Sequence, residues 1–278
     1  MQYSSYSVLM SVYFRENPEH LKNSIDSIFN QTLSTEDLVL VCDGALTREL
    51  DDVVEYYENK YPDIFSVIRL EKNMGLDKAL SEGIKICKNE IVARMDTDDY
   101  AYPERCQMQL EIINSGVDIV GGTVREMTSN MEDTGIYRTL PEFHDDIEKF
   151  ARRRNPFNHP TVMFRKSKVE QAGGYKPFYL CEDYYLWVRM LMKGCKAYNI
   201  QDVLLDMRAG NEMYNRRSGY KYLKSMISFR FYMKKIGFSG NTDFVLSCLG
   251  QIVSTMVPNS IRKYIYKKFL RKNANIKE

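Results

Sequence analysis

Short apolar runs alternate with stretches of helical periodicity along the first 120 residues of the chain. The runs are short and contain β-branched residues, a pattern that is typical of strands covered on both faces. The stretches between them repeat apolar side chains every three or four residues, as amphipathic helices do. The expected strands are residues 7–12, 38–42, 66–70, 91–95 and 118–122. This alternation predicts an α/β fold with a doubly wound, mainly parallel sheet and right-handed crossovers.

The expected helices carry recognisable signals at their ends. Asn17 followed by Pro18 supplies an N-cap and a proline in the first turn, and Thr47 is the expected cap of the second helix. Pro62 ends that helix, and Gly116 closes the fourth. These signals support a helix between each strand and the next.

Beyond Met127 the segments become shorter and more polar. A strand at 162–164, a helix that begins at Glu182, a last strand at 203–208 and helices at 220–235 and 243–272 are expected. No internal repeat or low-complexity linker divides this part of the chain. We therefore expect one domain over residues 1–217, with a first half at 1–127 and a second half at 128–217, followed by a helical C-terminal region at 218–278.

Positive charge is concentrated at the C-terminal end. The whole chain has a formal net charge of +2, but residues 258–278 contain seven Lys or Arg and one Glu, so the rest of the chain is net negative. Ile261, Tyr264, Ile265 and Phe269 recur on one face of a helix expected at 258–272. Basic amphipathic helices of this kind bind anionic membrane surfaces. The alternative is a helix that packs on the domain with its lysines in water.

Several absences narrow the expected setting. The N-terminal residues lack the basic and apolar segments of a secretory signal, and the six cysteines show no CxxC spacing, which favours a reduced cytoplasmic location. The longest apolar stretch, 244–257, is shorter than the roughly 20 residues that a membrane span needs. The acidic body, without an RNA-binding signature, argues against nucleic acid as a partner. We expect a cytoplasmic protein, peripheral on the inner face of the membrane if the basic helix docks there.

Three carboxylates follow the fourth strand directly. Asp96, Asp98 and Asp99 fall within four consecutive positions, at the strand end where ligands bind in open α/β sheets. One interpretation is a solvated acidic turn in which Asp99 caps the next helix. The other is a site for Mg²⁺ or Mn²⁺, since hard divalent cations prefer carboxylate oxygens and would relieve the mutual repulsion.

Further acids lie in comparable places. Asp43 follows the second strand and is expected at the same edge of the sheet, although Asp-Gly is also a common turn pair. Glu182 and Asp183 open an aromatic helix, where the helix dipole alone favours acidic residues.

The order and spacing of these features resemble the family 2 glycosyltransferases, which have the GT-A fold and use nucleotide-diphosphate sugars. The resemblance covers roughly residues 5–217, and it makes 1–127 a Rossmann-like nucleotide-sugar half and 128–217 an acceptor half. The matching pieces are Ser7 to Tyr13, Val41-Cys42-Asp43-Gly44, Asn73-x-Gly75-x-x-x-Ala79-x-x-x-Gly83, Met95-Asp96-Thr97-Asp98-Asp99, Pro103-x-Arg105, His159-Pro160-Thr161 and Glu182-Asp183-Tyr184-x-Leu186-Trp187.

The resemblance implies a role for each acid. Asp43 corresponds to a contact with the nucleotide base or ribose. Asp98 corresponds to the direct ligand of Mn²⁺ or Mg²⁺, with Asp96 nearer the ribose and Asp99 in support. Asp183 corresponds to the catalytic base that takes the proton of the acceptor hydroxyl. Its competitor for that role is Glu182.

The resemblance also implies roles for aromatic and basic side chains. His159 and Trp187 are expected with Glu182 on the acceptor side, although a histidine before a proline is also commonly held by loop hydrogen bonds. Lys78 and Arg105 are candidates for contacts with the diphosphate, and the alternative is that both are merely solvated. A basic loop that closes over the bound donor would contain Arg208, Arg216 and Arg217, and the alternative is a basic loop that is merely solvated.

The expected activity is inverting, metal-dependent transfer of a single sugar. The Gln-x-x-Arg-Trp signature of the processive synthases is absent, because the only tryptophan is Trp187. A UDP sugar is the expected donor and a saccharide, lipid-linked as in bacterial capsule, exopolysaccharide and O-antigen assembly, the expected acceptor. Ser81 and Cys42 depart from the family pattern and leave the donor open. The alternatives are a sugar nucleotidyltransferase and a non-catalytic membrane-surface scaffold.

Overall fold

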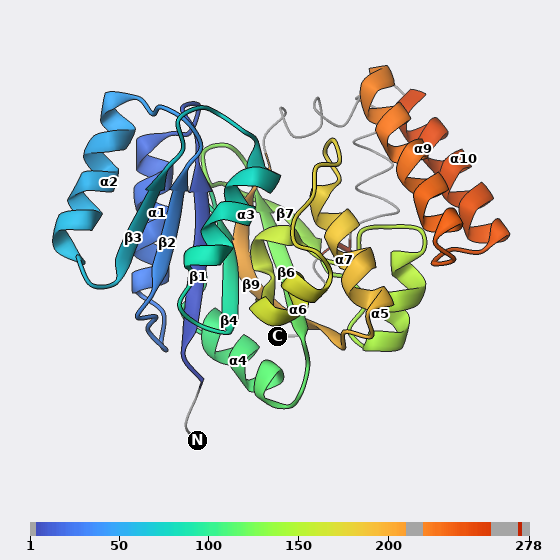
Figure 1. The fold of residues 1–278 in the computed structure, drawn as a ribbon, viewed down its shortest axis with the longest axis horizontal. Coiled ribbons are helices and arrows are strands. Elements are labelled where there is room, and N and C mark those ends of the chain that lie inside the picture. Colours follow the sequence, from blue (N-terminus) through green and yellow to red (C-terminus); the bar gives the residue numbers. More distant parts are fainter. Residues whose placement is uncertain (1–3, 210–218, 257–271, 274–278) are drawn as a thin grey trace.

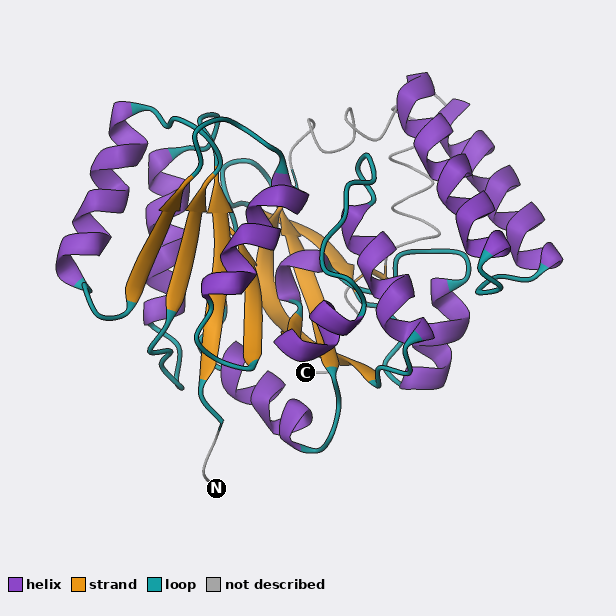
Figure 2. Ribbon diagram, viewed as in Figure 1, coloured by secondary structure: helices purple, strands orange, loops and turns teal. Residues whose placement is uncertain are grey.

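The computed structural model describes residues 4–209, 219–256 and 272–273, which form one curled sheet with helices on both sides (Figures 1 and 2). The first elements are β1 (Tyr6–Val12), α1 (Pro18–Phe29), β2 (Leu38–Cys42), α2 (Arg48–Lys60), β3 (Phe65–Arg69), α3 (Leu76–Ile86), β4 (Ile91–Asp96), β5 (Tyr100–Ala101), α4 (Arg105–Asn114) and β6 (Ile119–Met127). Each strand and helix expected in this part is present and begins within two residues of its expected position.

The second part of the chain adds shorter elements and a helical pair. These are β7 (Asp133–Arg138), α5 (His144–Ala151), a 3-10 turn (His159–Thr161), β8 (Met163–Arg165), α6 (Lys166–Gln171), α7 (Glu182–Met192), β9 (Ala197–Arg208), α9 (Gly219–Lys235), α10 (Asn241–Met256) and β10 (Lys272–Asn273). The sequence pattern missed β5, β7 and α5, because these elements are short or carry polar and glycine residues without a clear period.

The sheet is mixed, with a parallel core. Its order is β10-β7-β6-β8-β4-β1-β2-β3, in which β3, β2, β1 and β4 are parallel, while β9 pairs with β5 and β6. The expected α/β fold with a mainly parallel sheet is confirmed, although the strand expected at 118–122 (β6) does not pair directly with β4. β8 lies between β4 and β6 and is antiparallel to both. The chain therefore enters β8 from the edge at which β4 ends, which brings the turn at His159 to the acids after β4.

Alternation along the strands produces two apolar cores. Leu9, Val41 and Val92 face α3 and α7, whereas Met10, Leu40 and Met95 on the opposite face of the same strands contact α1, α2 and α4. Both faces of the parallel strands are therefore covered, as their continuous apolar runs predict.

Glycine allows α3 to lie very close to the sheet. A Cβ atom added to Gly83 would lie 2.4 Å from Leu9 Cδ1 and 2.7 Å from Val41 Cγ2, so a larger residue would push α3 away from β1 and β2. This close packing determines where the start of α3, beside Asp43, meets the edge of the sheet.

The C-terminal helices pack beside α7. Met226, Phe229 and Met233 of α9 join the same apolar cluster as α7, and α10 lies outside α9 (Figure 1). The helix expected at 220–235 is confirmed. The basic helix expected at 258–272 lies outside the described residues except at its end, where Lys272 belongs to β10 and pairs with Tyr137 of β7, so the expectation of helix at Lys272 is wrong. The domain boundary at residue 217 stays a prediction.

Candidate active site

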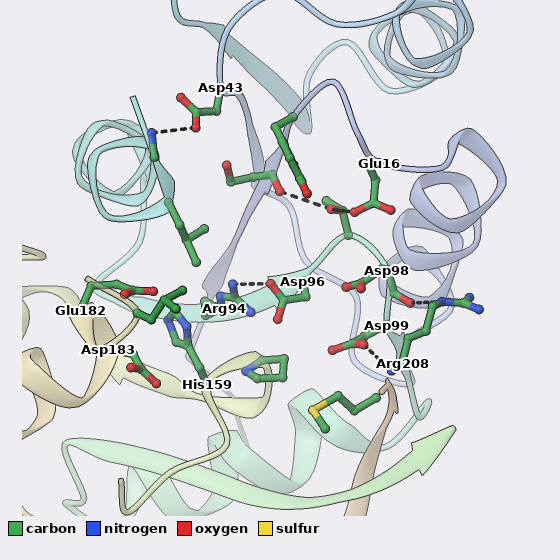
Figure 3. Close-up of a pocket in the computed structure, with 18 of the residues that line it drawn as sticks. Glu16, Asp43, Arg94, Asp96, Asp98, Asp99, His159, Glu182, Asp183 and Arg208 are labelled. Carbon is green, nitrogen blue, oxygen red and sulfur yellow. Dashed lines mark hydrogen bonds and ion pairs between the residues drawn. The ribbon is translucent and has the colours of Figure 1, made fainter. Parts of the chain in front are cut away.

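A cavity of about 470 Å³ opens at the carboxyl ends of β1, β2 and β4. The 3-10 turn, the start of α7 and the end of β9 complete its wall (Figure 3). The predicted site residues that line it are Asp43, Asp96, Asp98, His159, Glu182, Asp183 and Arg208. Residues as far apart in the sequence as Ser11 and Arg208, 197 positions, thus meet at the edge where ligands bind in this class of sheet.

The acids after β4 form a compact cluster. Carboxylate oxygens of Asp96, Asp98 and Asp99 lie within 4.8 Å of one another. Burial and the neighbouring Asp96 and Glu16 raise the pKa of Asp98 to about 7. Burial, followed by the charge of Asp98, raises the pKa of Asp99 well above its usual value. A divalent cation would offset this repulsion, so the donor set fits Mg²⁺ or Mn²⁺.

Asp99 completes this cluster and does not cap a helix. Its Oδ1 accepts a hydrogen bond from the Arg208 backbone N–H at 2.8 Å, while its buried Oδ2 has no partner among the described residues. The following residues form β5, and α4 begins only at Arg105, after Glu104. The interpretation of Asp99 as a helix cap is therefore wrong, and the orphaned oxygen is an additional observation that fits a cation.

Asp43 holds the loop that leads into α3. Its two carboxylate oxygens accept hydrogen bonds from the backbone N–H groups of Met74 at 2.6 Å and Gly75 at 2.9 Å. Gly75 has φ of 92°, a conformation that favours glycine. Asp43 is almost completely buried yet lines the cavity, so the loop it orders forms part of the cavity wall. Its contact with the nucleotide stays a prediction.

Glu16, which carried no expectation, lines the cavity beside the acid cluster (Figure 3). Its carboxylate accepts hydrogen bonds from Thr97 Oγ1 at 3.1 Å and from the Asn17 backbone N–H at 2.9 Å. Burial raises its pKa. An acid just after the first strand, at the same edge as Asp43 and Asp96, was the available signal.

Glu182 and Asp183 lie at the start of α7 and line the cavity, as expected. Asp183 Oδ2 accepts a hydrogen bond from Asn155 Nδ2 at 2.6 Å, which holds the carboxylate in place. Burial, followed by the charge of Asp183, raises the pKa of Glu182 to about 7. Asn155 was not anticipated, because nothing in the sequence of its loop marks it.

The raised pKa of Glu182 predicts a pH-dependent effect on stability. Below about pH 4.5 Glu182 is protonated in both states, but as pH rises to 7 the unfolded chain loses this proton while the folded protein keeps it, so the destabilisation grows and then levels off. Glu182→Gln should raise the free energy of unfolding by about 1 to 3 kcal/mol at pH 8 and by less at pH 5.

Urea unfolding of both proteins at the two pH values measures this difference. Glu55→Gln, on the exposed surface of α2, is the matched control and should change stability equally little at both. An equal gain from Glu182→Gln at pH 5 and pH 8 would contradict the assignment.

His159 is a neutral part of the cavity wall. Its Nε2 lies 3.0 Å from Tyr175 Oη, and its ring packs edge-on against Trp187. Burial and the adjacent Arg94 hold the pKa of His159 well below its usual range. Trp187 is completely buried and is not among the lining residues, so the expectation of an acceptor contact is corrected: its ring supports His159 from the core.

The predicted basic residues divide into different classes. Arg105 is completely buried and donates to the carbonyl of Arg94 at 2.6 Å, so it does not reach the cavity and the expected diphosphate contact is corrected. Lys78 does not line the cavity and pairs with Glu82 at 2.6 Å. Arg208 lines the cavity, with its Nε donating to the Asp98 carbonyl at 3.0 Å.

Three further arginines differ in what the structure describes of them. Arg216 and Arg217 lie outside the described residues, and their role stays a prediction. Arg94, which carried no expectation, lines the cavity from β4 and forms an ion pair with Asp96. A charged residue inside an apolar strand was the signal that could have revealed it.

Comparison with known proteins identifies the group to which this site belongs. The model of the Glycosyl transferase family 2 matches residues 7–173. The UDP-Gal:alpha-D-GlcNAc-diphosphoundecaprenol beta-1,3-galactosyltransferase of Escherichia coli is 36% identical over 269 residues, covering 96% of this chain and 97% of that protein. The amylovoran biosynthesis glycosyltransferase AmsE of Erwinia amylovora is 38% identical over 268 residues, covering 95% and 98%.

A solved structure agrees in fold. The mannosyltransferase PcManGT of Pyrobaculum calidifontis, in complex with GDP-Man and Mn²⁺, has a TM-score of 0.61 and 15% identity, covering 94% of this chain and 72% of that one. The acids at the carboxyl edge, the family match over residues 7–173 and the nearly full-length relatives agree. The chain therefore belongs to the family 2 glycosyltransferases and is an enzyme with the GT-A fold.

Proposed function

We propose that this enzyme transfers one sugar, with inversion, from a UDP sugar to a saccharide acceptor carried on a lipid, in bacterial surface polysaccharide synthesis. The observation that carries the proposal is that the acid cluster of β4 and the carboxylates of α7 line one cavity (Figure 3). The Escherichia coli relative, whose name specifies UDP-Gal and a GlcNAc-diphosphoundecaprenol, supports the classes of donor and acceptor.

Asp98 and Asp99, with Asp96 beside them, would hold Mn²⁺ or Mg²⁺ on the donor side. Bound there, the cation would neutralise charge on the diphosphate of the donor. The raised pKa of Asp98 and the orphaned Oδ2 of Asp99 support this assignment. The solved neighbour with GDP-Man and Mn²⁺ is consistent with it.

Asp183 acts as the base in the proposed reaction. The acceptor hydroxyl oxygen attacks the anomeric carbon and forms the new glycosidic bond, while its proton moves to the Asp183 carboxylate. The bond between the anomeric carbon and the diphosphate oxygen breaks, and its electron pair leaves with the nucleoside diphosphate. Asn155 orients Asp183 through the 2.6 Å hydrogen bond.

A donor panel tests the proposed function. Purified protein with Mn²⁺ is incubated with UDP-galactose, UDP-glucose, UDP-N-acetylglucosamine and GDP-mannose, together with a GlcNAc-diphospholipid acceptor, and nucleotide release is measured. Acceptor-dependent UDP release from one UDP sugar is expected. Release from GDP-mannose alone would overturn the UDP assignment.

The lipid acceptor suggests how the enzyme meets the membrane. No helix among the described residues is long and apolar enough to cross a bilayer. Half-exposed apolar side chains line the outer face of α10, namely Val245, Leu246, Leu249 and Val253. The only charged residue of α10, Asp243, pairs with Arg153 at 2.6 Å. The next fifteen residues contain five Lys or Arg and no acid. We propose that α10 and this basic segment dock on the anionic inner face of the membrane.

Vesicle flotation tests the docking. Wild-type protein should float with phosphatidylglycerol-containing vesicles and less with pure phosphatidylcholine vesicles. The double variant Leu249→Asp, Val253→Asp should bind about tenfold or more weakly, since two aliphatic side chains that would insert into the membrane are replaced by charged ones. Ile86→Asp, at an equally exposed position at the end of α3, is the control and should float like the wild type. Equal binding of all three proteins would contradict the proposal. A second contradicting result would be a wild-type protein that is dimeric and does not float, together with an α10 variant that is monomeric, because the apolar face would then bind a second copy of the chain.

A further inference from the structure

Arg94 occupies an unusual place on β4. Val92, Arg94 and Asp96 point to the same face of the strand, because side chains alternate along a strand. Val92 belongs to the apolar cluster on that face, and Arg94 is only 1% exposed. An aliphatic residue at this position would extend the core. Replacing a buried ion pair by apolar residues is often neutral or stabilising, so stability alone does not explain an arginine here. Because Arg94 also lines the cavity, its buried charge points to a role in ligand binding.

The backbone of Arg94 is fixed on both sides. Its N–H donates to the Val162 carbonyl at 2.8 Å, and its own carbonyl accepts from Arg105 at 2.6 Å. The guanidinium Nη2 is ion-paired with Asp96 Oδ1. The residue before β8, the side chain of Arg105 in α4 and the carboxylate of Asp96 thus hold Arg94 in place beside the cavity.

Two N–H donors of this guanidinium have no hydrogen-bond partner among the described residues. They are Nε and Nη1 of Arg94, and both are buried. Leaving a buried donor unsatisfied is costly, more so for a charged group. Acceptor atoms of a bound ligand would satisfy both, because the side chain borders the cavity.

The surroundings select the chemical class of this ligand. Arg94 and Asp96 form a pair with no net charge, in which N–H donors stand next to a carboxylate acceptor. A hydroxyl group can accept a hydrogen bond from the guanidinium of Arg94 and donate one to the carboxylate of Asp96. A phosphate, in contrast, would be repelled by the negative charge of Asp96. His159, neutral at physiological pH, adds no charge at this place. Neighbouring sugar hydroxyls therefore fit better than phosphate oxygens.

The position of Arg94 agrees with this class. It lies two residues before Asp96, about 7 Å further down the strand. In Figure 3 it lies between the acid cluster and the carboxylates of Glu182 and Asp183. In the proposed reaction the donor sugar lies between the acid cluster, which holds the diphosphate, and Asp183, which binds the acceptor hydroxyl. Its anomeric carbon is bonded to the diphosphate and is attacked by that hydroxyl.

We propose that Arg94, together with Asp96, forms a subsite for hydroxyl groups of the donor sugar, and that Arg94 determines how tightly the sugar is held. This inference rests on the proposed function. Arg94 binds the sugar through Nε and Nη1, and Asp96 keeps the guanidinium plane in position.

Calorimetry with Mn²⁺ and three ligands separates the sugar from the phosphates. Kd is measured for UMP, for UDP and for the tightest-binding of UDP-galactose, UDP-glucose and UDP-N-acetylglucosamine. Arg94→Lys keeps the charge but loses the planar pair of donors. It should weaken the sugar nucleotide by about tenfold or more and change UDP and UMP by less than about threefold.

Arg105→Lys is the matched control, because Arg105 is equally buried but does not line the cavity. Arg105→Lys should lower the thermal midpoint without changing the ratio of the Kd for the sugar nucleotide to the Kd for UDP. Arg94→Met, which removes all donors at similar length, should lose the same sugar-specific affinity as Arg94→Lys.

Three outcomes are distinguishable from the expected one. If the Arg94 variants bind UDP more weakly than the wild type but bind UMP equally well, Arg94 contacts the second phosphate, and the inference is overturned. Equal losses for all three ligands show that Arg94 only supports Asp96, and also overturn it. A wild-type protein that binds UDP and every sugar nucleotide no better than background overturns the proposed function itself.

Discussion

Asp183→Asn should lower kcat by about 10³-fold, within the range of 10² to 10⁴ that is typical for the loss of a general base. The asparagine has the shape of the carboxylate and retains an oxygen for the hydrogen bond from Asn155, so the start of α7 should stay in place. The affinity for the UDP sugar should change little, because the role proposed for Asp183 concerns the acceptor. Initial rates at saturating donor and acceptor measure the effect, and calorimetry measures donor binding.

Glu182→Gln is the control for this prediction. Glu182 precedes Asp183 on the same helix turn and lines the same cavity, but its carboxyl, with a pKa of about 7, is partly protonated at neutral pH. The glutamine variant should retain at least a tenth of the wild-type kcat. The opposite ranking, with Glu182→Gln inactive and Asp183→Asn active, would assign the base to Glu182.

Asp98→Asn should abolish metal-dependent donor binding and lower kcat/KM by about 10³-fold, since a catalytic cation contributes several kcal/mol of charge stabilisation. Excess chelator should have a similar effect on the wild type. At the same time the variant should be more stable than the metal-free wild type at pH 8, because it removes one of three crowded carboxylates.

Two measurements check this pair of effects. Calorimetry of UDP with and without Mn²⁺ should show metal enhancement in the wild type and none in Asp98→Asn, while thermal unfolding without metal should give the variant the higher midpoint. Glu16→Gln, outside the three-carboxylate cluster, should retain metal-enhanced binding. Full activity of the wild type in excess chelator would exclude the metal assignment.

Much of the first half of the fold could be predicted because its signals are local. The N-cap at Asn17, the cap at Thr47 and the apolar runs of β2 and β4 each depend on residues close together in the sequence. β8 is different. Its three residues identify a strand but not its partners, and the insertion between β4 and β6 depends on contacts between distant segments.

The candidate site shows the same division. The acids of β4 and α7 were predicted because carboxylates at strand and helix ends are visible in the sequence, and the cavity contains both groups. Asn155 was not predicted, because its hydrogen bond to Asp183 joins a loop and a helix 28 residues apart. Trp187 was placed at the acceptor because it belongs to the motif of the family that begins at Glu182, but its position on α7 turns the ring into the core.

The sequence by itself determined the order of the longer strands and helices in the first half, the edge at which the acids gather and the family, because periodicity, capping and motif spacing are properties of neighbouring residues. Only the tertiary structure decided that Arg94 and not Arg105 faces the cavity. Arg105 is held under β4 by Gln109 and the carbonyl of Arg94, whereas Arg94 turns to the cavity beside Asp96. The direction of each side chain follows from how α4 and β8 pack against β4, and packing between distant segments cannot be read from the local pattern.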